Sequence, residues 1–180
     1  MSSSSNLLIN RRRLLLALAA SPLAGLAMTG TATAAPTTGL RRWGSGEFRR
    51  FGLLIYAATL WASGDDPLQP PLALELTYKR TIKGRDIADA SIGEMRKLGV
   101  AGEARLRAWG ERMLAIFPDV RRGDRIVGVQ LPEAARFYFN DRSIGSIDDP
   151  AFARAFFAIW LDAGTSAPDL RAALLTRLES

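Results

Sequence analysis

The chain has 180 residues and a formal net charge of +6, and it contains neither histidine nor cysteine. Without an imidazole or a thiolate, Ser-His-Asp and Cys-His catalysis, thiol redox chemistry and ordinary zinc or haem sites are excluded. Acidic residues alternate with the basic ones, and no basic stripe is interleaved with aromatic residues, so we expect no nucleic-acid partner.

The acidic pairs of the chain do not predict a metal site. Asp65-Asp66 and Asp148-Asp149 lack the alternate-residue ligand spacing of a calcium loop, and we interpret them as turn and cap residues. We therefore expect no metal and no cofactor. Any acid–base chemistry would fall to Asp, Glu, Lys, Tyr or water bound by Arg.

The first 34 residues have the pattern of an export signal. Arg11-Arg12-Arg13 stand directly before an apolar run of Leu and Ala, and Ala32-Thr33-Ala34 follows. This order is typical of a cleaved secretory signal peptide, and the consecutive arginines favour the twin-arginine (Tat) route. We expect a Tat-type signal peptide over residues 1–34, one domain over residues 35–180, a periplasmic location and no stable membrane span after cleavage. An uncleaved anchor is the alternative, because Pro36 lies close to the cleavage site.

Residues 35–180 show strands, then helices, then strands, then helices, which is α+β order. Strands are predicted where apolar and β-branched residues cluster or alternate between turn signals. Helices are predicted where apolar residues recur at steps of three and four and stop at Gly99 or Pro118. The predicted elements are strands over 51–61 and 72–81, helices over 86–99 and 101–117, and a hairpin of 125–131 with 136–139 that ends at a turn at Asn140-Asp141.

The last third of the chain is predicted to be helical, with caps that can be assigned from the sequence. Asp149 before Pro150 is an N-cap signal. Ser166 with Asp169 resembles a capping box for a final helix over 168–178. We interpret Asp149, Thr165 and Ser166 as structural, and we assign to the core the stripe of Phe152, Phe156, Ile159 and Trp160.

Seven short motifs follow one another along residues 35–180. They are Gly44-x-Gly46-x-x-Arg49, Tyr56-x-x-x-Leu60-Trp61, Leu74-Glu75-Leu76-x-Tyr78, Glu94-Met95-x-x-Leu98-Gly99, Phe117-Pro118-Asp119-Val120-x-x-Gly123-Asp124, Phe137-Tyr138-Phe139-Asn140 and Phe157-x-Ile159-Trp160-Leu161. Their order and spacing together resemble the bacterial chalcone isomerase-like proteins. The resemblance implies an open-faced β-sandwich, in which a large antiparallel sheet is backed by a layer of helices. It also implies a ligand cleft between the sheet and the helices.

The plant enzymes of this superfamily close a flavanone ring on a chalcone, using an arginine that holds the phenolate nucleophile and a small polar set around it. The resemblance aligns that arginine with Arg49. Arg50 is the alternative, because the stretch from the arginine to the next strand is shorter here than in the plant enzymes. The threonine of the next strand aligns with Tyr56, and the polar residues at the start of the first helix align near Lys83, Asp86 and Ala90. Because three polar partners are replaced, the resemblance does not imply chalcone isomerase activity.

An arginine followed by a tyrosine on the next strand is similar to the fatty-acid-binding branch of the superfamily, in which the pair holds a carboxylate. A guanidinium can grip a carboxylate through two hydrogen bonds, a phenol adds a donor, and an apolar cleft takes the tail. We expect a non-catalytic periplasmic protein that binds a small amphipathic anion, such as a fatty acid or an aromatic carboxylate. Arg49 is the expected anchor, and Tyr56 and Tyr78 are the supporting donors.

Three alternatives remain open from the sequence. Arg49 could face solvent on a sheet edge, since Arg41, Arg42 and Arg50 make this segment generally basic. The protein could be an isomerase, an intramolecular lyase acting on a chalcone-like phenolic substrate. It could also be an interaction protein whose cleft is filled.

Overall fold

The structure is a computed structural model that describes residues 35–177. These residues belong to one compact unit, Thr33–Ser180. The predicted signal peptide, residues 1–34, lies outside the described residues. Among residues 35–177, no helix has both the length and the apolar character needed to cross a membrane.

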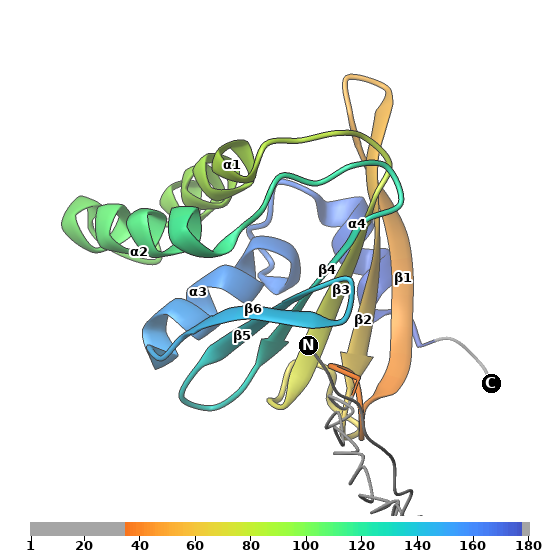
Figure 1. Cartoon of the computed structure of the whole chain (residues 1–180). Helices are drawn as coiled ribbons and strands as arrows, with labels where there is room; N and C mark the ends of the chain where they lie inside the picture. Colours follow the sequence, from red (N-terminus) through yellow and green to blue (C-terminus); the bar gives the residue numbers. More distant parts are fainter. Residues whose placement is uncertain (1–34, 178–180) are drawn as a thin grey trace, which may run out of the picture. The chain divides into compact units, whose positions relative to one another are not determined.

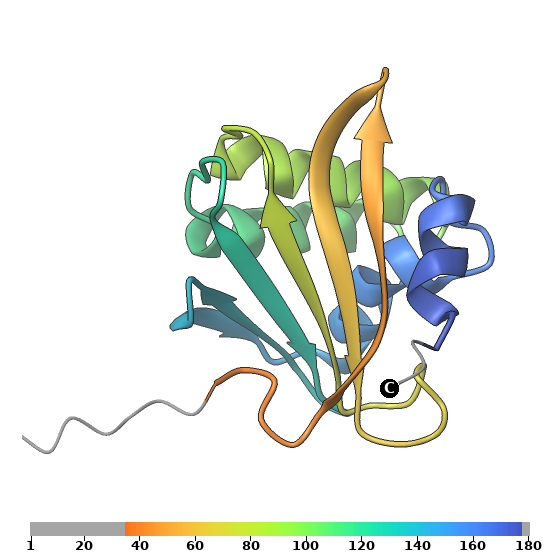
Figure 2. The same cartoon turned by 90° about the vertical axis from the view of Figure 1, so that its right-hand side faces the viewer.

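The described residues form one six-stranded antiparallel sheet and four helices. The strands lie in the sheet in chain order: β1 (Arg41–Arg50), β2 (Leu53–Ala62), β3 (Leu72–Tyr78), β4 (Arg125–Gln130), β5 (Ala135–Phe139) and β6 (Arg142–Ile147). Helices α1 (Gly84–Lys97) and α2 (Glu103–Ile116) connect β3 to β4, and α3 (Pro150–Leu161) and α4 (Pro168–Leu175) follow β6. The helices lie against one face of the sheet (Figures 1 and 2). This is the predicted α+β open-faced sandwich.

The two edge strands are elements for which the sequence analysis gave no prediction. β1 has two glycines and four arginines, and β6 contains Gly145 between Ile144 and Ser146, so neither shows a clear alternation of apolar and polar residues. Charged side chains are common on edge strands, because they discourage pairing with another chain. The strand predicted from Phe51 begins instead at Leu53, because Phe51 and Gly52 form the β1–β2 turn with φ values of +50° and +75°.

The helix caps confirm one prediction and correct another. Asp149 caps α3, because its Oδ1 accepts hydrogen bonds from the amides of Ala151 and Phe152 over 2.8 and 3.2 Å. The capping box at Ser166 is wrong: the N-cap of α4 is Ala167, and the Ser166 hydroxyl donates instead to Glu94 Oε2 of α1 over 2.5 Å. Ser166 therefore links the connection between α3 and α4 to α1.

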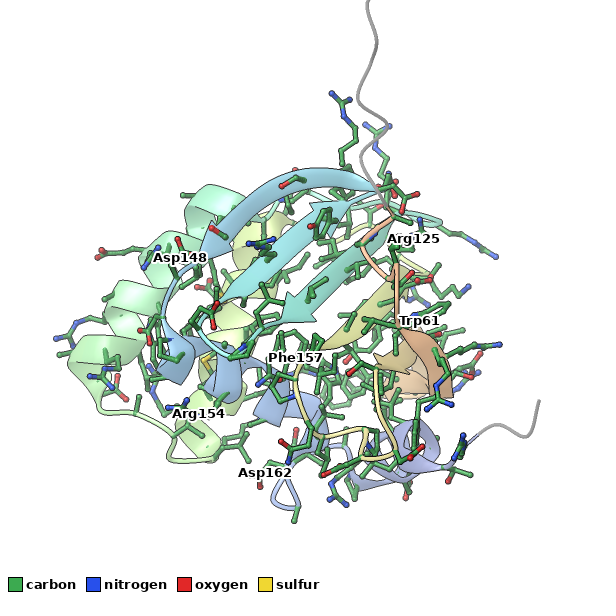
Figure 3. All side chains as sticks on the ribbon, turned by 90° about the horizontal axis from the view of Figure 1, so that it is seen from below. Trp61, Arg125, Asp148, Arg154, Phe157 and Asp162 are labelled. Carbon is green, nitrogen blue, oxygen red and sulfur yellow. The ribbon has the colours of Figure 1, made fainter. Side chains whose placement is uncertain are left out.

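Aromatic side chains form the centre of the core between α3 and the sheet. Phe137 of β5 is fully buried, and its ring centroid lies 5.1 Å from that of Phe156 of α3. Gly128 of β4 makes room for this cluster, because a Cβ there would lie 3.3 Å from the Phe157 ring; Figure 3 shows Phe157 between α3 and the strands. The predicted apolar stripe is confirmed as core: Phe152, Phe156, Ile159 and Trp160 are all buried.

Helix α4 lies unusually close to β1. A Cβ added to Gly44 would lie 2.2 Å from the carbonyl oxygen of Leu174, and one added to Gly46 would lie 2.8 Å from the Cβ of Ala173. The indole Nε1 of Trp43 donates to the carbonyl oxygen of Leu175 over 3.1 Å, which fixes the end of the helix. The Gly44-x-Gly46 motif thus lets α4 cover the edge of the sheet.

Candidate functional site: a cavity between the sheet and the helices

A cavity of about 310 Å³ lies between the inner face of the sheet and helices α1 and α3. Its volume is at the lower end of the range of small-molecule sites. Most of its wall is apolar, and the main contributors are Leu76, Ile126, Ile87, Phe117, Phe156, Ile159 and Trp160. The position agrees with the cleft implied by the resemblance, and the wall can take a hydrocarbon or aromatic group.

Two of the three predicted site residues, Tyr56 and Tyr78, lie side by side in the cavity wall. They are cross-strand partners on β2 and β3, and their ring centroids are 6.1 Å apart in an edge-to-face arrangement. Phe48 of β1 stacks on the other side of Tyr56, at 5.0 Å between centroids. Antiparallel pairing therefore brings both phenols to the same wall.

The two phenols differ in their hydrogen bonds. The Tyr56 hydroxyl accepts a bond from Trp160 Nε1 over 2.9 Å, so its own proton is free for another acceptor. The Tyr78 hydroxyl has no hydrogen-bond partner among the described residues, although Tyr78 is only 3% exposed. Burial raises the pKa of both phenols well above the usual range, so both stay protonated and can donate to a bound anion.

The third predicted residue, Arg49, does not line this cavity, whereas the competing Arg50 does. The side chain of Arg49 is 56% exposed, and its Nη2 pairs with Glu47 Oε2 over 2.9 Å. The reason is the alternation of side chains along β1: Phe48 and Arg50 share its inner side, and Arg49 between them points the other way. Opposite these residues a bulge in β2 leaves Ile55 without a partner, because Phe48 pairs with Tyr56 and Arg49 pairs with Leu54. The geometry favours Arg50 over Arg49 as the anchor.

A second depression, a groove of about 470 Å³, adjoins the cavity. Its wall includes Arg49, Phe51, Gly93 and Lys97, which do not line the cavity. The groove and the cavity share Phe48, Arg50, Ala90, Glu94 and Ser166. These five shared residues form the boundary between the two depressions, and both arginines of the β1 end border the groove.

Glu94 is a site residue to which the sequence analysis gave no functional role. Burial raises its pKa, but hydrogen bonds from Lys97 and Ser166 and the nearby charge of Arg50 lower it by more, so the net pKa is below the usual value. Lys97 Nζ lies 2.7 Å from Oε1 and the Ser166 hydroxyl lies 2.5 Å from Oε2. The signal in the sequence is that Glu94 lies on the same helical face as Ile87 and Ala90, where a carboxylate is unexpected.

Only some of the positions that the resemblance aligns with polar residues of the plant enzymes line the cavity. Asp86 and Ala90 line the cavity. Lys83 lines neither depression, and its Nζ pairs with Asp119 Oδ2 over 2.7 Å on the surface. Within residues 35–177, no group of three or more acidic side chains is arranged to hold a metal ion. The polar side chains that line the cavity are thus two tyrosines, two serines, two acidic residues and Arg50.

Comparison with known proteins agrees with the fold. No curated protein matches the chain in sequence. In structure it is similar to the crystal structure of a fatty-acid binding protein from Arabidopsis thaliana, with a TM-score of 0.61, 14% identity, and coverage of 76% of this chain and 87% of that chain. At this identity the likeness shows the fold. Residues 44–176 match a family model described as chalcone isomerase-like, and the chain therefore belongs to the chalcone isomerase-like family.

Proposed function

We propose that this protein is a non-catalytic binder of a small amphipathic anion, either a fatty acid or an aromatic carboxylate. The apolar tail lies in the cavity, and the carboxylate meets Arg50 and the phenols. The observation that carries the proposal is the hydroxyl of Tyr78, a residue only 3% exposed in the cavity wall, which has no hydrogen-bond partner among the described residues. A hydroxyl of this kind can donate to a ligand or water in the cavity without breaking a bond within the protein.

The charge at the edge of the cavity supports an anionic ligand. Arg50 lies at the boundary between the cavity and the groove, and Lys97 and Arg49 border the groove. The charge of Glu94 is already paired with Lys97, and its other oxygen accepts a hydrogen bond from Ser166. The guanidinium group of Arg50 can therefore donate hydrogen bonds to both oxygens of a carboxylate placed beside it. The Arabidopsis fatty-acid binding protein, which has the same fold, supports a lipid ligand.

The alternative of an isomerase acting on a phenolic substrate has less support. An isomerase needs a group that takes up and returns a proton near neutral pH. The phenols have raised pKa values, and the pKa of Glu94 is lowered, which makes it a weak base. Both oxygens of Glu94 are also engaged, one by Lys97 and the other by Ser166. These features favour binding over turnover.

We also propose that the protein acts in the periplasm after export by the Tat route. The support is the sequence of residues 1–34, with consecutive arginines before an apolar run and an A-x-A site.

Mass spectrometry of small molecules extracted from the natively purified protein tests the proposed function. We expect a co-purified fatty acid or aromatic carboxylate, and no loss of chalcone when the protein is incubated with it. Consumption of chalcone would instead establish an isomerase. Neither ligand nor turnover, together with no binding of added fatty acid, would indicate a filled cleft and contradict the proposal.

A further inference from the structure

The β1–β2 turn carries an aromatic residue in a conformation that does not suit it. Phe51 and Gly52 both have positive φ, +50° and +75°, as in a two-residue type I′ turn. Such turns favour Asn-Gly, because a bulky side chain is disfavoured in the left-handed region. A strained backbone conformation at a surface residue such as Phe51 is a reason to look for a function of that residue.

Packing does not explain Phe51 either. Its side chain is 91% exposed, and Leu53, two residues later, is 49% exposed. Figures 1 and 2 both show that the turn extends beyond the ends of the neighbouring strands and beyond α1. Two large apolar side chains therefore stand in water at the far end of a projecting hairpin.

Cations surround this apolar tip. Arg49 and Arg50 precede Phe51, and the Arg50 guanidinium lies 5.4 Å from the centre of the Phe51 ring. Arg80 joins them from the end of β3, where its Nε donates to the carbonyl oxygen of Leu54 over 3.3 Å. The turn thus has two exposed apolar side chains with three guanidinium groups beside them. Arg49 is also paired with Glu47.

We propose that the β1–β2 turn docks on an anionic phospholipid bilayer. Phe51 and Leu53 enter the interfacial region, and Arg49, Arg50 and Arg80 contact the headgroups. Interfacial anchoring needs only a few apolar side chains together with cations attracted to anionic lipid. A protein partner would need a contact of about 800 Å² on each side, for which a narrow projecting hairpin is poorly shaped.

Docking in this way would also give the site access to lipid. Phe51 and Arg50 border the groove, and the groove shares five wall residues with the cavity. A bilayer that holds the turn therefore lies next to the route by which an amphipathic anion would reach the cavity. The docking itself does not depend on the proposed function, because it is measured without any ligand of the cavity.

A fluorescent label at the turn tests the proposal in the whole chain. The sequence contains no cysteine, so Leu53→Cys gives a single site for a polarity-sensitive fluorophore, and Leu68→Cys, in the β2–β3 connection, gives a matched exposed control. A local label is needed because the apolar run in residues 1–34 could bind vesicles by itself. The probes are phosphatidylcholine vesicles with and without about 30% phosphatidylglycerol.

We expect a blue shift at position 53 with the anionic vesicles, little shift with the neutral ones, and none at position 68. Phe51→Asn gives the favoured Asn-Gly turn, so it keeps the fold while removing the apolar group. It should weaken the vesicle titration at position 53 by about tenfold or more.

Three results would overturn the proposal: no shift at position 53, equal shifts at both positions, or a titration unchanged by Phe51→Asn. A turn that stays in water beside anionic vesicles would leave a protein partner as the explanation of the exposed Phe51.

Discussion

The indole Nε1 of Trp160 on α3 donates a hydrogen bond to the Tyr56 hydroxyl on β2 over 2.9 Å. This bond joins the helical layer to the sheet at the wall of the cavity. Because the Tyr56 oxygen accepts from Trp160, its own proton is directed elsewhere, and the Tyr78 hydroxyl beside it has no hydrogen-bond partner among the described residues. The cavity therefore offers two protonated phenols, one of which also supports the fold.

This difference predicts that two matched substitutions differ in their effect on stability. Tyr78→Phe removes a hydroxyl that bonds to no described residue, so the free energy of unfolding should change by less than about 0.5 kcal/mol while ligand affinity falls by about 0.5–1.5 kcal/mol. Tyr56→Phe leaves the Trp160 indole without its acceptor and should cost about 1–3 kcal/mol of stability as well as affinity.

Urea unfolding and calorimetric titration with a long-chain fatty acid measure the two quantities separately. If Tyr78→Phe destabilised the protein as strongly as Tyr56→Phe and left binding unchanged, the Tyr78 hydroxyl would have a structural role and the assignment of the donors would be wrong.

A second prediction concerns the close contact of α4 with β1. Gly44→Ala would put a methyl group 2.2 Å from the Leu174 carbonyl oxygen, and a helix backbone cannot move away as a flexible side chain can. The substitution should destabilise the protein by about 3 kcal/mol or more. Gly64→Ala is the control, since nothing lies within 4 Å of its added Cβ. Equal melting temperatures for the two variants would show that α4 does not lie this close to the sheet.

A third prediction concerns pH and Asp149. Partial burial raises its pKa, but bonds from Trp109 Nε1 over 2.9 Å and from the amides of Phe152 and Ala151 lower it by more. The pKa in the folded state is therefore below the unfolded value of about 3.9. The Asp149 carboxylate contributes its full stabilisation at a pH above the unfolded-state pKa. This stabilisation is lost as the pH falls through the lower pKa of the folded state.

Asp149→Asn should keep the helix cap, because Asn is also a good N-cap, but it loses the acceptor for Trp109. We expect a loss of about 1 kcal/mol at pH 7 and a smaller loss near pH 3, measured by urea unfolding. A difference that grows as the pH falls would contradict the assigned direction of the pKa shift.

Much of the fold could be predicted from the sequence, because apolar periodicity records which face of an element is buried. The alternation of Leu72, Leu74 and Leu76 predicted β3, and Gly99 predicted the end of α1, where it has φ +66°. The edge strands were not predicted, because a strand such as β1 is rich in Gly and Arg and shows no apolar alternation. The capping box at Ser166 failed because a local pattern does not show that a carboxylate from α1 lies within reach.

The candidate site could be predicted only in part. Tyr56 and Tyr78 lie on the apolar faces of their strands, and their side chains do line the cavity. Arg49 and Arg50 could not be distinguished, because the sequence did not predict β1 and therefore did not show which of its residues share a side with Phe48. Glu94 was missed because Ser166, which is distant in the sequence, comes within hydrogen-bond reach of it only in the folded chain.

A fourth prediction concerns export. Replacing Arg11, Arg12 and Arg13 by Lys keeps the positive charge but removes every possible arginine pair, so the protein should stay in the cytoplasm. The consecutive arginines Arg41 and Arg42, replaced by Lys in the same way, are the control and should leave export unchanged. Cell fractionation measures the outcome, and a full periplasmic yield in a strain without the Tat system would rule this route out.

Calorimetric titration of the delipidated protein with a long-chain fatty acid tests the central claim most directly. Arg50→Ala should weaken binding by about 1.5–3 kcal/mol, and Arg50→Lys should fall between it and the unsubstituted protein, because it keeps the charge but loses the bidentate fork. Arg49→Ala, which removes an exposed pair with Glu47, should cost less than about 0.5 kcal/mol. A loss of binding in Arg49→Ala with none in Arg50→Ala, or no binding to the unsubstituted protein, would contradict the account.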